Sequence, residues 1–136
     1  MQLADVTGDG LLDVVASAMA DLNGVVDAGA LYVYAGGALQ TPWPSATLSV
    51  PGAVAGDEMF FMLVADVTGD GIPDVLGGAP DADFLRQAGR HALHAQGNVL
   101  DAGALYLFPG SPGMQGDQIP TTLAVPNAHA RDRLGS

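Results

Sequence analysis

One stretch of seven residues occurs twice in this chain, and this repetition limits the possible folds more than any other feature. Residues 4–10 read Ala-Asp-Val-Thr-Gly-Asp-Gly, and residues 65–71 repeat the same seven letters. Shortly afterwards each copy has an aspartate followed by an apolar run, which begins at Asp13 in the first copy and at Asp74 in the second. Such internal repetition indicates a protein built from copies of one structural unit.

The similarity between the two copies continues downstream. The further matching segments are residues 27–34 and 101–108, residues 46–51 and 121–126, and residues 56–60 and 131–135. The second copy is longer, because it carries an insertion between Ala79 and Asp101. A period of roughly 60–75 residues built from short strands is typical of a β-propeller or another β-repeat array.

Each copy is predicted to contain four strands, because its apolar runs are short, rich in Val, Leu, Tyr and Phe, and bounded by turn residues. The predicted strands are residues 2–4, 13–18, 30–35 and 46–50 in the first copy, and residues 60–65, 74–79, 104–109 and 121–125 in the second. We therefore expect an all-β protein with blades of four antiparallel strands. Gly89 disfavours helix in the inserted segment 80–100, where we predict a long, exposed hairpin loop.

The charge of the chain narrows the classes of partner. Asp and Glu number 15 against four Lys and Arg, which gives a net charge of −11. Such a surface repels nucleic acids and anionic membranes and attracts cations. No apolar run approaches the roughly 20 residues needed to span a bilayer, and no signal peptide is visible. We expect no nucleic-acid partner and no membrane insertion.

The repeated loop gathers oxygen-bearing groups of the kind that calcium prefers. It follows the pattern D-x-T-x-D-G-x-x-D, so the side chains at its first, fifth and ninth positions can converge on one ion. The third-position hydroxyl and the seventh-position carbonyl add oxygens, and the sixth-position glycine permits a sharp bend. We predict Ca²⁺ in each loop, about two ions in all. The predicted ligands are Asp5, Thr7, Asp9, Leu11 and Asp13 in the first loop, and Asp66, Thr68, Asp70, Ile72 and Asp74 in the second.

Other interpretations of the loop are less favoured. An EF-hand or a dockerin repeat needs an acid at position 12, where this chain has Ala16 and Gly77. Pro73, inside the second loop, suits a turn at a strand edge better than a helix start. A plain turn remains an alternative, because Asp, Gly and Thr are common turn residues. Two identical copies that both keep the third aspartate favour metal binding.

These motifs resemble the FG-GAP repeat, the blade unit of integrin-α-like β-propellers. Residues 66–80 resemble its loop and Gly-Ala-Pro segment, and residues 103–111 resemble its downstream strand. The resemblance implies propeller blades with calcium in their loops, an extracellular or cell-surface location, and a role in adhesion or protein–protein interaction. The units expected from it are residues 1–56 as a first blade, residues 57–131 as a second blade with the inserted loop 80–100, and residues 132–136 as the start of a further repeat.

The expected partners follow from the repeat. One repeat unit cannot bury its apolar face alone, so about two blades leave faces to be covered. We expect other FG-GAP blades to cover them, in the same longer chain or by homo-oligomerisation. A protein or glycan ligand is expected in addition.

No catalytic motif is visible, since the sequence lacks cysteine and any G-x-S-x-G segment, so we expect a non-enzymatic module. A carbohydrate-binding propeller and a propeller attached to a secreted hydrolase stay open as alternatives. Trp43, which lies between two prolines, would stack on a sugar in the first of these, although we expect it to be a packed loop anchor. We interpret His91 and His94 as part of a solvated loop.

Overall fold

The computed structural model describes residues 1–19, 21–82, 103–123 and 133, which form nine strands in two sheets and one short 3₁₀ turn, η1 (Gly36–Ala38). The first sheet has the order β1 (Gln2–Ala4), β2 (Asp13–Ala18), β3 (Ala30–Tyr34), β4 (Ala46–Leu48) and β8 (Gly116–Gln118). The second has the order β5 (Phe61–Ala65), β6 (Asp74–Ala79), β7 (Ala104–Phe108) and β9 (Thr121–Leu123). Neighbouring strands are antiparallel except β4 and β8, which are parallel. The predicted all-β fold of antiparallel blades is confirmed.

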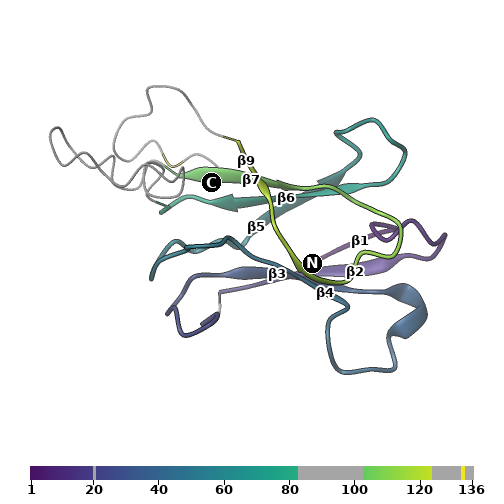
Figure 1. The fold of residues 1–136 in the computed structure, drawn as a ribbon, viewed down its shortest axis with the longest axis horizontal. Coiled ribbons are helices and arrows are strands. Elements are labelled where there is room, and N and C mark those ends of the chain that lie inside the picture. The colour runs from purple at the N-terminus through teal and green to yellow at the C-terminus, as the bar shows by residue number, and fades with distance from the viewer. Residues whose placement is uncertain (20, 83–102, 124–132, 134–136) are drawn as a thin grey trace, which may run out of the picture.

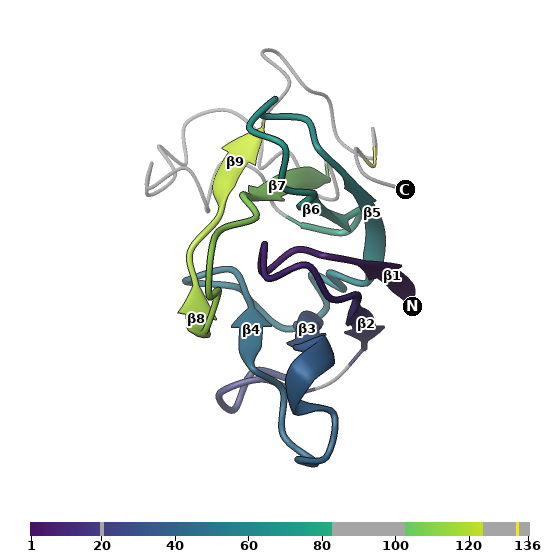
Figure 2. The same cartoon turned by 90° about the vertical axis from the view of Figure 1, so that its right-hand side faces the viewer.

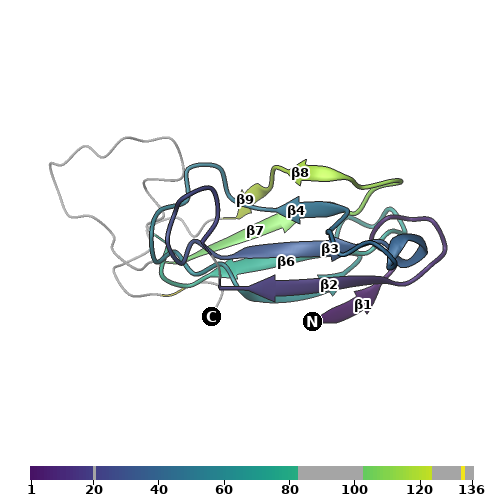
Figure 3. The same ribbon diagram turned by 90° about the horizontal axis from the view of Figure 1, so that it is seen from below.

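Most strands lie where the sequence placed them. β1, β2 and β6 have the predicted bounds, and β3, β4, β5 and β7 are shorter by one or two residues. The predicted end of β9 and residues 83–100 of the inserted segment, including His91 and His94, lie outside the described residues. Two elements were not predicted, η1 and β8. β8 follows β7 in the chain, yet it is the fifth strand of the first sheet, beside β4 (Figure 3).

The two sheets stack face to face (Figure 2). The facing side chains, each at most 1% exposed, are Val15, Leu31 and Val33 from the first sheet and Val75, Tyr106 and Phe108 from the second. The sheets pack tightly at Gly77 of β6, because a Cβ atom there would lie 3.2 Å from Leu31 Cδ1 of β3 and 3.1 Å from Met59 Sδ. Each such side chain contributes about 1.5–3 kcal/mol on burial, so this apolar layer is the main force that joins the sheets.

The two sheets have the same internal register. Val33 of β3 lies opposite Val15 of β2, and Leu107 of β7 lies opposite Leu76 of β6, at the matching positions of the two sequence copies. Each position of the first sheet therefore has a defined equivalent in the second. The sheets are two copies of one four-stranded unit, to which β8 is added.

Hydrogen bonds also tie the sheets together at their β1–β5 edge. The Gln2 side chain of β1 donates from Nε2 to the Met62 carbonyl (3.1 Å), and its Oε1 accepts the Val64 N–H (2.9 Å). One amide side chain thus satisfies two backbone groups of β5. These groups lie on the edge of β5 that no strand pairs, which is where unsatisfied backbone is otherwise exposed.

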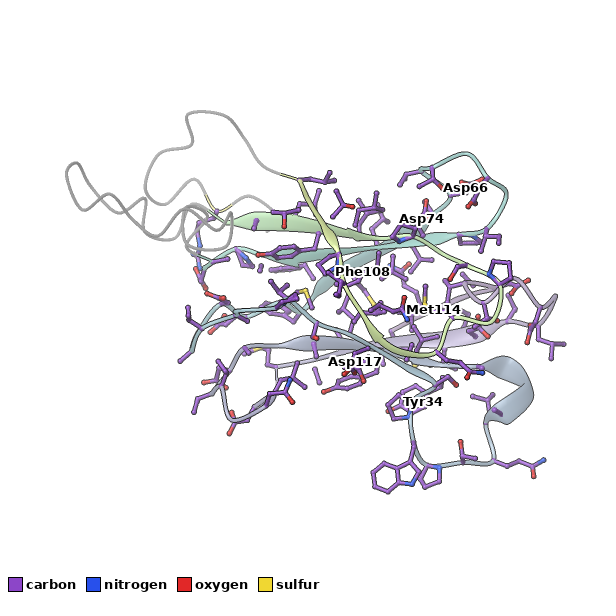
Figure 4. All side chains as sticks on the ribbon, viewed as in Figure 1. Tyr34, Asp66, Asp74, Phe108, Met114 and Asp117 are labelled. Carbon is purple, nitrogen blue, oxygen red and sulfur yellow. The ribbon has the colours of Figure 1, made fainter. Side chains whose placement is uncertain are left out.

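A second link comes from the connection between β7 and β8, which crosses from the second sheet to the first (Figure 1). Ser111 N–H donates to the Val6 carbonyl (3.1 Å), and Gly113 N–H donates to the Thr7 carbonyl (2.9 Å). Between these bonds and β8, Met114 inserts into the core and is 3% exposed, and Figure 4 shows its side chain between the sheets. The connection therefore holds one sheet against the loop that begins the other.

One buried polar group of the core is unsatisfied. The Tyr106 hydroxyl has no hydrogen-bond partner among the described residues, although the side chain is fully buried. Burial and the nearby Asp57 carboxylate raise the pKa of the Tyr106 phenol. This phenol therefore stays neutral and carries the desolvation cost of an unpaired hydroxyl.

Candidate metal centre

The two Asp-rich loops lie at the same end of the molecule, one in each sheet (Figure 1). The first Asp loop, residues 5–13, joins β1 to β2, and the second Asp loop, residues 66–74, joins β5 to β6. Each loop therefore occupies the same corner of its sheet. Both are flanked by strands rather than helices, in agreement with the rejection of an EF-hand.

In the first Asp loop, the first and fifth positions cap the backbone of the loop itself. Asp5 accepts the Asp9 N–H through Oδ1 (3.0 Å) and the Gly10 N–H through Oδ2 (2.8 Å). Asp9 accepts the Leu11 N–H through Oδ1 (2.8 Å), and its side chain is exposed. Gly10 has a φ of 87°, the left-handed conformation that the sharp bend was predicted to require.

The second Asp loop has a similar arrangement, in which the first aspartate caps Gly69 where Asp5 caps Asp9. Asp66 accepts the Gly69 N–H (2.7 Å) and the Gly71 N–H (2.9 Å), and Asp70 accepts the Ile72 N–H (2.9 Å). Gly71 has a φ of 91°. Figure 4 shows Asp66 in the loop that extends beyond the strands. Among the described residues, no basic side chain is hydrogen-bonded to either of the two carboxylates at the mouth of each loop.

The ninth position of the first loop is different, because Asp13 is fully buried at the start of β2. Its Oδ2 accepts the Thr7 N–H (2.9 Å), and its Oδ1 accepts the Gly36 N–H (2.9 Å) and the Thr7 hydroxyl (3.4 Å). This one carboxylate connects the loop to Gly36, the first residue of η1. It therefore fixes the position of the loop on the sheet.

Asp74 has the same role in the second loop. Its Oδ2 accepts the N–H groups of Val67 (2.8 Å) and Thr68 (2.9 Å), and its Oδ1 accepts the Gly110 N–H (3.0 Å). Burial acts to raise the pKa of Asp74, but the hydrogen bonds from Thr68, Gly110 and Val67 outweigh burial and hold this pKa below its ordinary value. The carboxylate is thus ionised and satisfied in the interior.

The glycines that donate to these buried aspartates were not recognised from the sequence. A Cβ atom at Gly36 would lie 2.4 Å from the Leu12 carbonyl oxygen, and one at Gly110 would lie 2.3 Å from the Pro73 carbonyl oxygen. Only glycine allows the chain after the third strand to approach the Asp loop so closely. The signal was available, because both glycines occupy the same position after their matching strands.

The two loops differ in how they are covered. Val6 and Thr7 are 0% and 3% exposed, because the connection after β7 lies across them. The equivalent Val67 is 52% exposed, and Thr68 is exposed as well. The second Asp loop therefore has internal hydrogen bonds similar to those of the first but lacks the cover.

In each loop the side chains at the first and fifth positions therefore lie at the mouth, and the side chain at the ninth position lies in the interior. Within the described residues, no three His, Asp or Glu side chains gather into a group that could hold a metal ion. The predicted ligand set, with Thr7, Leu11, Thr68 and Ile72 as its other members, stays a prediction. The oxygen-only chemistry of the loop mouths is the chemistry that a hard cation such as Ca²⁺ binds.

The expectation that Trp43 is a packed loop anchor is wrong. Its side chain is 76% exposed, in the loop between η1 and β4. Pro42 and Pro44 restrict the backbone on either side of the ring, and the indole is left largely open to solvent.

Comparison with known families agrees with this geometry. The model of the FG-GAP repeat matches residues 61–108, which span β5, the second Asp loop, β6 and β7. This segment is similar to the FG-GAP repeat. The first sheet has the register of this segment, and its Asp loop differs from the second only at the seventh and eighth positions, so it is a second copy of the same four-stranded unit. A search of curated proteins finds no match to the chain.

FG-GAP repeats are typically non-catalytic propeller modules that interact with neighbouring blades. The stacked sheets described here are consistent with two blades of such a propeller. No helix among the described residues is long and apolar enough to cross a membrane.

Proposed function

We propose that this chain is a calcium-binding, non-enzymatic FG-GAP module that mediates protein–protein interaction outside the cell or at its surface. The observation that supports it most is the repetition of one loop with similar hydrogen bonds at the same corner of both sheets. In each loop two aspartates meet at the mouth while the third is used internally. The aspartates at the mouth cap backbone N–H groups of their own loop, as turn residues do, and calcium binding would in addition account for the repetition of all three acids in both copies.

The half-buried Asp5 and the exposed Asp9 would supply carboxylate oxygens to the ion, and the exposed Asp66 and Asp70 would do so in the second loop. The Leu11 and Ile72 carbonyls would add neutral oxygens from the same mouths, since both residues lie beside the exposed aspartates. Asp13 and Asp74, with Thr7 and Thr68 hydrogen-bonded to them, would complete each set from the interior. Bound Ca²⁺ would offset the repulsion between carboxylates within a loop.

Electrostatics supports a cation as the ligand of these loops. The chain carries a net charge of −11, and the acidic loop mouths contribute part of it. A cation bound only by the folded chain stabilises that chain by mass action, by about 2.7 kcal/mol when its concentration is a hundred times its Kd. Calcium would therefore act as a structural ion that fixes the corner of each blade.

The family match supports the interaction role and the location. FG-GAP proteins are typically extracellular, and their repeats suggest contact with other proteins or blades. The acidic surface excludes nucleic acids and anionic membranes as partners. Adhesion or protein binding is the role that remains, with the loops and the sheet faces as the available surfaces.

The proposal is tested by thermal unfolding of the chain in EDTA and in Ca²⁺, with Mg²⁺ as the control ion. We expect Ca²⁺ to raise the unfolding temperature of the wild-type chain and not that of an Asp9→Ala, Asp70→Ala double variant. Replacement of Asp117, an exposed aspartate outside the loops, should leave the calcium response intact. An unchanged melt in Ca²⁺ for the wild-type chain would refute calcium binding.

Carbohydrate binding is a second candidate, and the exposure of Trp43 favours it. An indole that is 76% exposed and flanked by prolines offers a flat, preorganised surface of the kind on which sugar rings stack. A glycan array compares the wild-type chain with Trp43→Ala. Binding that is lost in this variant would support the candidate, and a wild-type chain that binds no glycan would exclude it.

A further inference from the structure

A short hairpin joins β2 to β3 at the end of the first sheet away from the first Asp loop (Figure 1). Leu22 and Val25 pair across it, because the Leu22 N–H donates to the Val25 carbonyl (3.0 Å) and the Val25 N–H donates to the Leu22 carbonyl (2.9 Å). Asn23 and Gly24 form the two-residue turn between them, with φ angles of 52° and 82°. Positive φ at both central residues indicates a type I′ turn, for which Asn-Gly is the preferred sequence.

An asparagine followed by a glycine can lose its side-chain amide without an enzyme. The Gly24 nitrogen attacks the side-chain carbonyl carbon of Asn23 and forms a new C–N bond. The bond from this carbon to the amide nitrogen breaks, and ammonia leaves with the proton that Gly24 gave up. Water then opens the resulting five-membered succinimide at one of its two carbonyl carbons, which gives aspartate or isoaspartate. Glycine favours the attack, because it carries no Cβ atom beside the attacking nitrogen.

The same arrangement of an Asn or Asp side chain before a glycine occurs at three places in the chain. They are Asp9-Gly10, Asn23-Gly24 and Asp70-Gly71. In the first Asp loop both reacting groups are held, because the Gly10 N–H donates to Asp5 Oδ2 (2.8 Å) and Asp9 Oδ1 accepts the Leu11 N–H (2.8 Å). The second Asp loop holds its pair in the same way.

The pair at the tip of the hairpin is free of such restraints. Among the described residues, neither the Asn23 side chain nor the Gly24 N–H makes a hydrogen bond. Both residues are exposed, and a Cβ atom at Gly24 would meet nothing within 4 Å. Ring closure changes the backbone of the turn, so the two hydrogen bonds between Leu22 and Val25 must open first. A hairpin with a single bridged pair opens locally at low cost.

We propose that Asn23 is a site of spontaneous deamidation, at which the tip of this hairpin is converted to aspartate and isoaspartate. Isoaspartate adds a methylene to the main chain, so the two-residue turn no longer fits and Leu22 and Val25 lose their paired hydrogen bonds. Asn23 also lines a cleft of about 340 Å³, which the 49–53 turn and residues 117–119 complete. Either product places a new carboxylate at this cleft.

The change should stay at the tip of the hairpin. Its base is tied separately, because the Asp27 N–H donates to Asp21 Oδ1 (3.1 Å), and the adjoining Ala28 is buried. The reaction consumes only water and releases only ammonia. It is independent of the calcium proposal, since the hairpin lies away from both Asp loops.

The test maps isoaspartate in the full chain, folded and unfolded in urea, during incubation in EDTA at mildly alkaline pH. Mass spectrometry of proteolytic peptides detects conversion of the amide to a carboxylate, and enzymatic methylation detects isoaspartate at all three glycine pairs. Asn23→Gln is the control variant, because its longer side chain cannot close the five-membered ring. Asn98 and Asn127, which precede Val and Ala, are controls within the same chain.

We expect Asn23 of the folded chain to convert at least about tenfold faster than Asn98 and Asn127, whose following residues carry a Cβ atom. Folding should suppress isoaspartate at Asp9 and Asp70 at least about tenfold more than at Asn23, because the hydrogen bonds of the Asp loops must open first. The Asn23→Gln variant should form no isoaspartate at this position. An Asn23 that stays intact in the folded chain would overturn the proposal, and so would equal suppression at all three sites.

Amide hydrogen exchange of the converted chain reads the structural consequence. Exchange at Leu22 and Val25 should accelerate, because isoaspartate removes their paired hydrogen bonds, whereas exchange at Val33 in the core of the first sheet should not change. Unchanged protection at Leu22 and Val25 would show that conversion does not open the hairpin, and this part of the proposal would then be wrong.

Discussion

Replacement of Asp13 by alanine should cost the fold far more than replacement of the neighbouring Asp9. Asp13 is fully buried and accepts three hydrogen bonds, from the Thr7 N–H, the Thr7 hydroxyl and the Gly36 N–H. The alanine variant leaves these donors without an acceptor. Thr7 is 3% exposed, so water cannot replace the carboxylate at its N–H.

The expected loss of stability in Asp13→Ala follows from the number of hydrogen-bond donors left without an acceptor. A buried donor left unsatisfied costs about 1–3 kcal/mol, and Gly36, which is only half-buried, recovers part of its loss from water. Relief of the buried charge offsets a further part. We expect Asp13→Ala to lower the free energy of unfolding by about 2–4 kcal/mol. Asp9→Ala removes one exposed hydrogen bond and should cost at most about 1 kcal/mol in EDTA.

Urea unfolding followed by far-UV circular dichroism in EDTA measures both free energies without a contribution from calcium. Trp43 is a poor probe for this measurement, because it is 76% exposed in the folded chain and its surroundings change little on unfolding. Equal losses in Asp13→Ala and Asp9→Ala would show that the ninth position does not anchor the loop. Asp13 would then hold the loop on the sheet no more firmly than Asp9 at the loop mouth.

Three further predictions follow from single groups. Gly110→Ala should destabilise the chain by about 1–3 kcal/mol in urea unfolding, because its Cβ would lie 2.3 Å from the Pro73 carbonyl oxygen; no loss would contradict the close approach. Tyr106→Phe should leave stability unchanged or raise it by about 1 kcal/mol, since it removes an unsatisfied buried hydroxyl. The control is Tyr32→Phe, at a half-buried tyrosine. A larger loss of stability in Tyr106→Phe than in this control would show that the Tyr106 hydroxyl has a hydrogen-bond partner. The pKa of Asp74 is depressed in the folded chain, so the stability that its ionised carboxylate contributes is complete above about pH 4. This stability is lost as the pH falls through the folded pKa. If acid unfolding curves of the wild type and Asp74→Asn ran parallel below about pH 4, they would contradict this prediction.

The strands could be predicted from the sequence because their signals are local. Alternation in residues 30–34 and the apolar runs after Asp13 and Asp74 are properties of a few neighbouring residues, and each became a strand. The Asp loops were equally visible, because their pattern is repeated letter for letter. Periodicity and repetition together were sufficient for the fold class.

What could not be predicted depends on contacts between distant residues. β8 has the sequence Gly-Asp-Gln, which carries no strand signal, and it is a strand only because β4 offers an edge to pair with. The inward role of Asp13 depends on Gly36, which lies on another strand connection. Trp43 was misjudged because an aromatic side chain between prolines gives no sign of whether a surface lies near it.

Calorimetric titration of calcium into the chain tests the central claim most directly, because it counts sites. The account predicts two Ca²⁺ ions per wild-type chain, one after either Asp9→Ala or Asp70→Ala, and none after both replacements. Leu11 and Ile72 contribute only backbone carbonyls to the predicted sites, so Leu11→Ala and Ile72→Ala should keep the full stoichiometry. No binding by the wild-type chain, or undiminished binding by the double variant, would contradict the account.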